Sequence, residues 1–250
     1  MRVGGLLLVV VAALVTAGCD RSPPGTAGAP GRAGQAGVGG AFAARCAALP
    51  PAPPEVDAIP LLPQLDQTRS LAELTAMYER ATANHETLGL THAQLTYASE
   101  LAANGFQEDG RACMRVKVRV QVSMAPATVF IAREVAADPC RREAVREHEM
   151  KHVTVHDGFL RGTPSRLLAL LDAADVGRTR HGADPGTIQQ EAMREVKDIV
   201  AQAEAADRVS LAAMQAAVDT PEEYARVAAS CGGTFVAVPP DGLRGPTDHR

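Results

Sequence analysis

Hydrophobic and polar side chains alternate without interruption over residues 114–124, where Met and Val occupy the even positions. A period of two places successive side chains on opposite faces of a β-strand, so this stretch is predicted to be a strand with one buried face. Pro126 interrupts the pattern, because proline cannot donate a hydrogen bond to a neighbouring strand. Residues 128–132 are predicted to form a second strand, paired with the first in antiparallel fashion.

The first predicted helix begins at Ser70. Ser70 and Glu73 have the spacing of a capping box, in which each side chain accepts a hydrogen bond from the other residue's backbone. Apolar residues then recur at helical spacing as far as residue 81. The pattern of residues 91–103 is ambiguous, and we interpret it as a second short helix that ends at Gly105.

The chain from residue 138 onward is predicted to be largely helical. Asp138 caps one helix, which Gly158 ends, and a further helix runs from Pro164 to residue 171. Residues 177–186 form a polar loop.

Two more capping boxes open the last helices. Thr187 with Gln190 begins a long helix, and Thr220 with Glu223 begins the final one. The predicted fold class is therefore α+β and mostly helical, with a small antiparallel β segment followed by the helices.

The N-terminus has the features of a bacterial export signal. An uninterrupted apolar run at residues 6–15 is too short to span a bilayer comfortably, and residues 1–18 are predicted to be a signal peptide. The small residues before Cys19 resemble the lipobox of bacterial lipoproteins, which implies that the Cys19 sulfur carries a lipid. The alternative is an ordinary cleaved signal that Cys19 happens to follow. A lipid on Cys19 implies a protein of the cell envelope, held on a membrane and facing the periplasm or the exterior.

Composition divides the rest of the chain. Residues 19–65 are rich in Gly, Ala and Pro and are predicted to be a lipid-anchored, flexible or extended tether. Residues 66–236 form the predicted domain, and residues 237–250 are predicted to be a disordered tail.

Net charge excludes one class of partner. The chain carries a formal net charge of −4 and has no basic patch interleaved with aromatic residues, so no nucleic-acid partner is expected. Arg115, Lys117 and Arg119 share one face of the predicted strand, and a solvated sheet face explains them better than an anion-binding surface does.

Four cysteines follow Cys19, and an even number in an exported chain predicts two disulfides. Of the three possible pairings we favour Cys113 with Cys140 and Cys46 with Cys231. A zinc site made of these thiols is the alternative, but no two of them have the short spacing that such a site needs.

Residues 148–152 read His-Glu-Met-Lys-His, an HExxH motif, inside the helix predicted from Asp138. Residues four apart lie one turn apart on the same helical face, so His148 and His152 can hold one zinc ion. Glu149 is the candidate general base, which takes a proton from water that the metal activates.

The HExxH helix resembles that of the zincin metallopeptidases. The wider arrangement of strands, Cys113, Cys140, HExxH and trailing helices is similar to a bacterial domain family of unknown function thought to comprise zinc-dependent proteases. The resemblance covers residues 90–230 and implies Zn²⁺ as the cofactor.

A third protein ligand is needed. The resemblance to zincins that take a glutamate from a later helix implies Glu195, with Glu191 and His156 as alternatives. His156 lies too far along a straight helix from His148 to share one ion with it. His181 and Tyr224 are weaker candidates, for a ligand or for a group that stabilises the transition state.

Two functions follow from these observations. The first is a membrane-tethered zinc-dependent hydrolase, a peptidase that uses a metal-activated water on a protein or peptide substrate. The alternative is a non-catalytic envelope lipoprotein that binds a partner or a metal.

Overall fold

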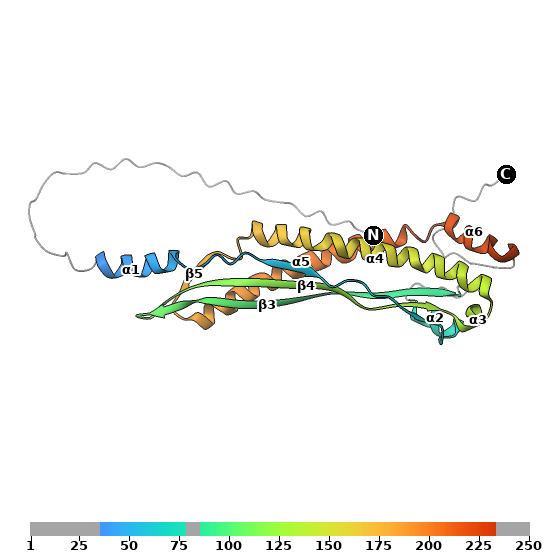
Figure 1. Cartoon of the computed structure of the whole chain (residues 1–250), viewed down its shortest axis with the longest axis horizontal. Coiled ribbons are helices and arrows are strands. Elements are labelled where there is room, and N and C mark those ends of the chain that lie inside the picture. Colours follow the sequence, from blue (N-terminus) through green and yellow to red (C-terminus); the bar gives the residue numbers. More distant parts are fainter. Residues whose placement is uncertain (1–35, 79–85, 234–250) are drawn as a thin grey trace, which may run out of the picture.

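The structure is a computed structural model, and it describes residues 36–78 and 86–233. The predicted signal peptide, Cys19 and the predicted tail at residues 237–250 lie outside these ranges. The described residues form an elongated molecule, in which two long helices lie along a long β-hairpin (Figure 1).

The hairpin consists of β3 (Gly89–Glu108) and β4 (Arg111–Ile131), which pair in antiparallel fashion from end to end. Asp109 and Gly110 connect them with positive φ angles of 49° and 71°, the backbone conformation that a tight two-residue hairpin requires. The short helix predicted for residues 91–103 is therefore wrong, because β3 occupies them. Alanine-rich sequence favours a helix locally, but pairing with the β-branched residues of β4 overrides that preference.

The prediction that residues 128–132 form a separate second strand is also wrong. β4 continues through Pro126 to Ile131, and its antiparallel partner is β3. The register of β3 shifts between Ala93 and Leu95, opposite Pro126, so the missing N–H of the proline falls where the pairing is already interrupted.

Three shorter strands pair with the other edge of β4 and complete a five-stranded mixed sheet within the described ranges. β1 (Glu55–Ala58) and β2 (Gln64–Asp66) are parallel to β4, and β5 (Thr179–Gly182) is antiparallel. β1 lies inside the predicted tether at residues 19–65 and β2 crosses its end, so the sheet includes residues before 66, where the domain is predicted to begin. The extended conformation expected of this proline-rich segment lets it add to the sheet.

Helices α4 (Pro139–Ala173) and α5 (Pro185–Ala216) cover one face of the sheet. The prediction that one helix ends at Gly158 and another begins near Pro164 is wrong, because both residues lie inside α4. The apolar face of α4 continues across them and packs on β4, and this burial outweighs the local preference to break. The main core joins side chains of these three elements: Val118, Val120, Val122, Phe159, Leu160, Leu167, Leu171, Val196 and Val200.

The predicted mostly helical α+β class is confirmed, but the β segment is longer than expected. Smaller helices complete the described chain: α1 (Ala36–Ala47), α2 (Leu71–Met77), α3 (Arg133–Ala136), α6 (Pro221–Ala229) and the 3₁₀ turn η1 (Ser230–Gly233).

Three of the four predicted helix caps, at Ser70, Asp138 and Thr220, are confirmed and one is shifted. Ser70 and Glu73 form the capping box of α2, and the Thr220 hydroxyl accepts the backbone N–H of Glu223 at the start of α6. The N-cap of α5 is Asp184, whose carboxylate accepts the N–H of Thr187, so that helix begins earlier than predicted.

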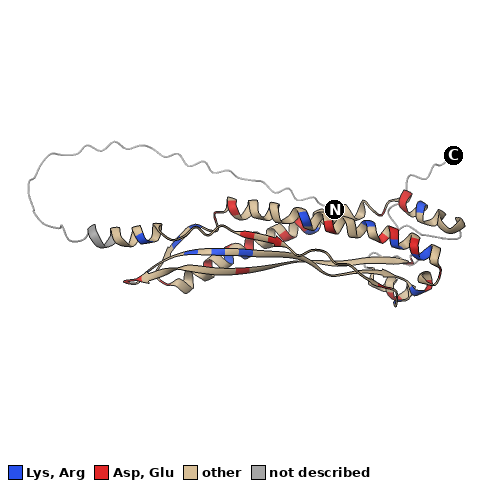
Figure 2. Ribbon diagram, in the orientation of Figure 1, with Lys and Arg blue, Asp and Glu red and all other residues tan. Residues whose placement is uncertain are grey.

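The basic face of β4 is neutralised by the neighbouring strand. Lys117 and Arg119 form ion pairs with Glu55, and Arg119 also lies 3.7 Å from Asp57, both acidic residues being on β1. Figure 2 shows this row of basic residues along β4. The prediction of a solvated sheet face agrees with these pairs.

Disulfides join Cys46 to Cys113 and Cys140 to Cys231 in the described part of the chain. The four predicted cysteines are all paired, but the favoured pairing was wrong. The first bond attaches α1 to the tip of the hairpin, and the second ties η1, which directly follows α6, to the first turn of α4. Sequence spacing could not distinguish the pairings, because partners 67 and 91 residues apart meet only through the tertiary fold.

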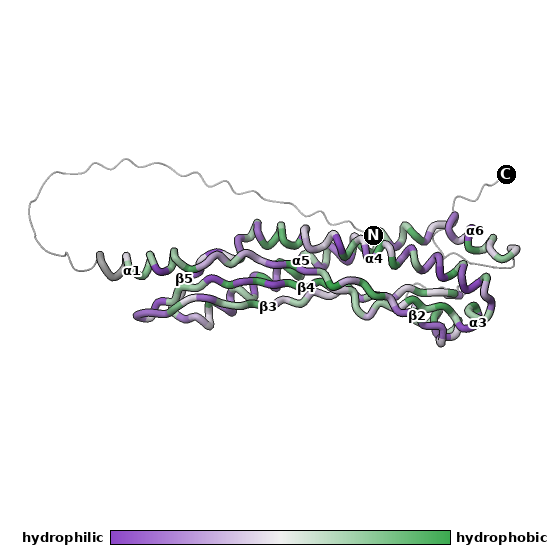
Figure 3. Tube along the Cα trace, viewed as in Figure 1, coloured by the Kyte–Doolittle hydropathy of each residue, from purple (hydrophilic) through white to green (hydrophobic). Residues whose placement is uncertain are grey.

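Disulfides are typical of proteins outside the reducing cytoplasm. Figure 3 shows hydrophobic and hydrophilic positions mixed along α4 and α5. Among the described residues, no helix combines the length and the hydrophobicity needed to cross a membrane.

The pairing predicts the outcome of peptide mapping. Non-reducing digestion should yield one peptide pair that contains Cys46 and Cys113 and another that contains Cys140 and Cys231. Cys140→Ser with Cys231→Ser should lower the free energy of unfolding by about 2–5 kcal/mol, because the unfolded chain regains the freedom that the bond removed. A cross-link between Cys113 and Cys140 would contradict the structure.

Candidate metal centre

The HExxH motif lies on the buried face of α4. Asp138 caps this helix by accepting the N–H groups of Cys140 and Arg141, which fixes where the helix begins. His148 and Glu149 are both buried, and His152 is nearly so. All three line a cavity of ≈ 280 Å³. Its walls come from Tyr78 after α2, the start of β3 with the residues just before it, α4, the end of α5, and α6 with the linker before it.

Asp219 brings the two histidines together. Its Oδ1 atom lies 3.3 Å from Nε2 of His148 and 3.1 Å from Nε2 of His152. The ligand atoms of these three residues all lie within 4.8 Å of one another. Asp219 lies in the short linker between α5 and α6, so one turn of α4 and one loop form a compact group of three.

The other nitrogen of each imidazole has its own partner. Nδ1 of His148 lies 3.3 Å from Oε1 of Glu223, and Nδ1 of His152 lies 2.6 Å from Oε1 of Gln215. Carboxylate and amide oxygens only accept hydrogen bonds, so each Nδ1 carries the proton and donates it. Nε2 of each ring donates to the Asp219 carboxylate, and loss of that proton would free the Nε2 lone pair for a metal while the Nδ1 bond keeps the ring oriented.

Charges within this group shift several pKa values. Burial opposes the charged form of His152, but the hydrogen bond with Asp219 and the charge of Glu149 outweigh burial and raise its pKa to about 9. The pKa of His148 is raised in the same way, against burial, by Asp219 and Glu149. Burial would raise the pKa of Asp219, but hydrogen bonds from both histidines hold it well below its usual range.

Glu149 is held between α4 and β3. The Thr91 hydroxyl donates to its Oε2 at 2.9 Å and to its backbone oxygen at 3.1 Å. Burial raises its pKa, although the charges of His152 and His148 oppose this change. Gly89 lies so close that a Cβ there would be 2.7 Å from Oε1 of Glu149, so only glycine allows β3 this approach.

Tyr224, a weak candidate from the sequence, lies at the site. Its ring centre is 5.8 Å from that of His148, and it lines the cavity. Burial and the charge of Asp219 raise its pKa, so its hydroxyl remains protonated and can donate a hydrogen bond.

The structure excludes Glu195 and Glu191 as ligands of this group. Glu195 forms ion pairs with Arg178 at 2.8 Å and with Arg180 at 2.6 Å. It precedes Gln215 by 20 residues on the same helix, a distance of about 30 Å along the axis. Glu191 lies one turn farther away, so neither predicted glutamate lies near the HExxH histidines, and the carboxylate beside them is that of Asp219.

His156 also lies outside the ligand group, because α4 runs straight past it without the break that would bring it to His148. It nevertheless lines the cavity. Burial, followed by the charges of His152 and His92, lowers its pKa to about 4.

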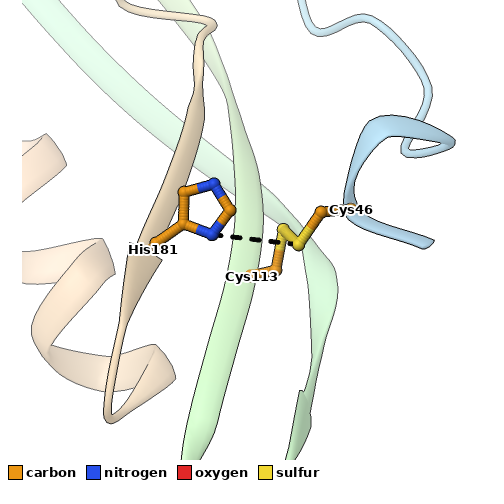
Figure 4. Close-up of side chains that lie close together, drawn as sticks. All are labelled: Cys46, Cys113 and His181. Carbon is orange, nitrogen blue, oxygen red and sulfur yellow. Dashed lines mark hydrogen bonds between the residues drawn. A yellow bond between two sulfur atoms is a disulfide. The ribbon is translucent and has the colours of Figure 1, made fainter. Parts of the chain in front are cut away.

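His181 belongs to a different part of the molecule. It lies on β5, where its Nδ1 atom is 3.9 Å from Sγ of Cys46 in the disulfide with Cys113 (Figure 4). These three residues could hold a metal by the distances between their atoms, but both sulfurs are already committed to the disulfide. His181 is therefore not part of the HExxH site.

The donor set suits zinc. Two imidazole nitrogens and one carboxylate oxygen would supply three protein ligands, the number that catalytic zinc sites use while leaving a position open. The hydrogen bonds to each Nδ1 are of the kind that orient histidine ligands in known zinc sites.

Sequence reasoning found the HExxH residues but missed Asp219, Gln215 and Thr91. The one available signal was the position of Asp219, a carboxylate directly before the helix cap at Thr220. Nothing local distinguishes it from other acidic residues, because its partners precede it by 67 and 71 residues.

Comparison with known proteins found no matching family model, no matching curated protein and no matching solved structure.

Asp219 and Glu195 offer a matched pair of variants. Asp219→Ala should lower zinc affinity by more than about 100-fold, because it removes a ligand rather than an outer partner. Glu195→Ala removes the same charge about 30 Å away along α5 and should leave zinc affinity unchanged. Competition titration with a chromogenic chelator measures both. Equal zinc affinity in the two variants would exclude Asp219 as a ligand.

Proposed function

We propose that the protein is a zinc-dependent hydrolase that cleaves peptide bonds. The observation that carries the proposal is the convergence of both HExxH histidines on Asp219, with Glu149 buried beside them in the same cavity. The hydrogen bonds to Nδ1 of His148 and His152 support it, since partners of this kind orient histidine ligands in zinc sites.

Zinc, when bound, acidifies water and polarises a carbonyl group. Glu149 is the general base that accepts the proton from water. The same carboxyl group can return that proton to the leaving amine. The Thr91 hydroxyl fixes the carboxylate, and Tyr224 offers a donor to the oxygen on which negative charge develops.

A peptide substrate is favoured by the strand that borders the cavity. Residues 87–93, at the start of β3, line the cavity. Within the described ranges β3 pairs only with β4, so no strand occupies its outer edge. An extended peptide can pair with such an edge, and main-chain pairing accepts many sequences.

Glu149→Gln separates catalysis from metal binding. Glutamine has nearly the same size but cannot accept the proton, so hydrolysis should fall by about 10²–10⁴-fold while zinc content is unchanged. Zinc content is measured by elemental analysis, and hydrolysis with a mixture of fluorescence-quenched peptides.

Full activity in Glu149→Gln would exclude Glu149 as the base. A wild-type chain that binds no zinc would instead favour the second function, a non-catalytic envelope protein that binds a partner.

The proposed location is the cell envelope. The two disulfides support a compartment outside the cytoplasm. The apolar run at residues 6–15 and the small residues before Cys19 support export and a lipid on the Cys19 sulfur, which would hold the protein on a membrane.

Cys19→Ser tests the lipid anchor. Serine has no thiol to accept a diacylglyceryl group, so the variant should lose labelling by a radioactive or alkyne-tagged fatty acid and appear unprocessed or in the soluble fraction. Cys140→Ser is the matched control and should keep the label. Equal labelling of wild type and Cys19→Ser would exclude lipidation at this position.

A further inference from the structure

His156 is a buried side chain that the proposed chemistry does not use. Only 6% of its surface is exposed. Its Nδ1 atom is buried and has no hydrogen-bond partner among residues 36–78 and 86–233. A buried polar group without a partner costs about 1–3 kcal/mol, so a histidine with no function here would be replaced at a gain in stability by an apolar residue.

The ring of His156 forms part of the wall of the same cavity as the metal ligands. Nδ1 is covered, so Nε2 is the nitrogen that an occupant of the cavity can reach. The neutral ring has a single N–H group. Because no hydrogen-bond acceptor lies beside Nδ1, the N–H group is on Nε2, and it can donate a hydrogen bond into the cavity.

The distance along α4 sets what the donor can reach. His156 follows His152 by one turn on the same face, an advance of about 6 Å along the axis. An extended peptide advances about 3.3 Å per residue, so two residues cover nearly the same distance.

β3 runs beside this part of α4. Gly89 lies against Val145 and Glu149, and Thr91 bonds to Glu149. His92 lines the cavity as well. The cavity is thus bounded by a strand and a helix over the stretch from the metal ligands to His156.

We infer that His156 is a substrate-binding residue that donates a hydrogen bond from Nε2 to a main-chain carbonyl two residues from the bond that is cleaved. This inference rests on the proposed function and extends it, because it assigns an extended peptide, longer than a dipeptide, as the substrate class. A contact with the main chain selects peptide substrates by their length and extended conformation rather than by a particular side chain.

Cobalt(II) in place of zinc provides a spectroscopic test that needs no substrate. The purified chain is loaded with cobalt and titrated with three hydroxamates, whose metal-binding group is the same. Acetohydroxamic acid has no peptide, whereas acetyl-Ala-Ala-hydroxamate extends to one side of the metal and a succinyl hydroxamate of Ala-Ala-amide extends to the other. Dissociation constants come from the change in the visible cobalt bands.

His156→Ala should raise the dissociation constant of one of the two peptide hydroxamates about fivefold, as expected for the loss of one neutral hydrogen bond. The dissociation constant of acetohydroxamic acid should be unchanged. His156→Gln, which keeps an N–H donor, should recover part of the loss. His181→Ala removes an exposed histidine from β5 and should change none of the three constants.

Unchanged cobalt bands in His156→Ala before titration show that the variant is folded and that its metal site is intact. Equal affinities of wild type and His156→Ala for both peptide hydroxamates would overturn the inference and leave the metal centre standing. A wild-type chain with no cobalt bands would overturn the proposed function itself.

Discussion

The hydrogen bonds along both edges of β4 are the constraint on which the structure depends. β3 pairs with one edge over its whole length, and β1, β2 and β5 share the other edge. The even-numbered side chains of β4 form the surface on which α4 and α5 pack. A change in the register of this strand would turn its valines to solvent and its basic residues toward the helices, so the alternation over residues 114–124 fixes the position of the motif helix.

The candidate metal centre also depends on how the end of α5, the linker after it and α6 are held against α4. α4 supplies two imidazoles at fixed spacing, but Asp219 and both partners of the Nδ1 atoms come from the end of α5, the linker after it and α6. The disulfide between Cys140 and Cys231 holds the far end of α6 beside the first turn of α4. Lys151 donates to Glu223 at 2.6 Å from the same side. The linker that carries Asp219 is thus fixed at both ends.

The sequence predicted the features that depend on neighbours along the chain. The period-two pattern of β4, the caps at Ser70 and Thr220 and the facing pair His148 and His152 are all local. The wrong predictions have one physical cause, which is that contacts between distant segments determine the features concerned. These features are the strand β3, the continuation of α4 through Pro164, the disulfide partners and the position of Asp219. Glu195 is a glutamate on a later helix, as the third ligand of such zincins is, but its carboxylate forms ion pairs with Arg178 and Arg180.

The tie between α1 and the hairpin tip determines from which end of the molecule the preceding chain departs. Cys46 is bonded to Cys113, and Phe42 contacts Phe106 with ring centres 5.2 Å apart, both near the tip (Figure 1). The HExxH motif lies beside Thr91 at the opposite end, about 50 Å away for a strand of 15 residues. The hairpin and the two helices packed along it therefore separate the disulfide-bound end of α1 from the HExxH cavity by most of the length of β3.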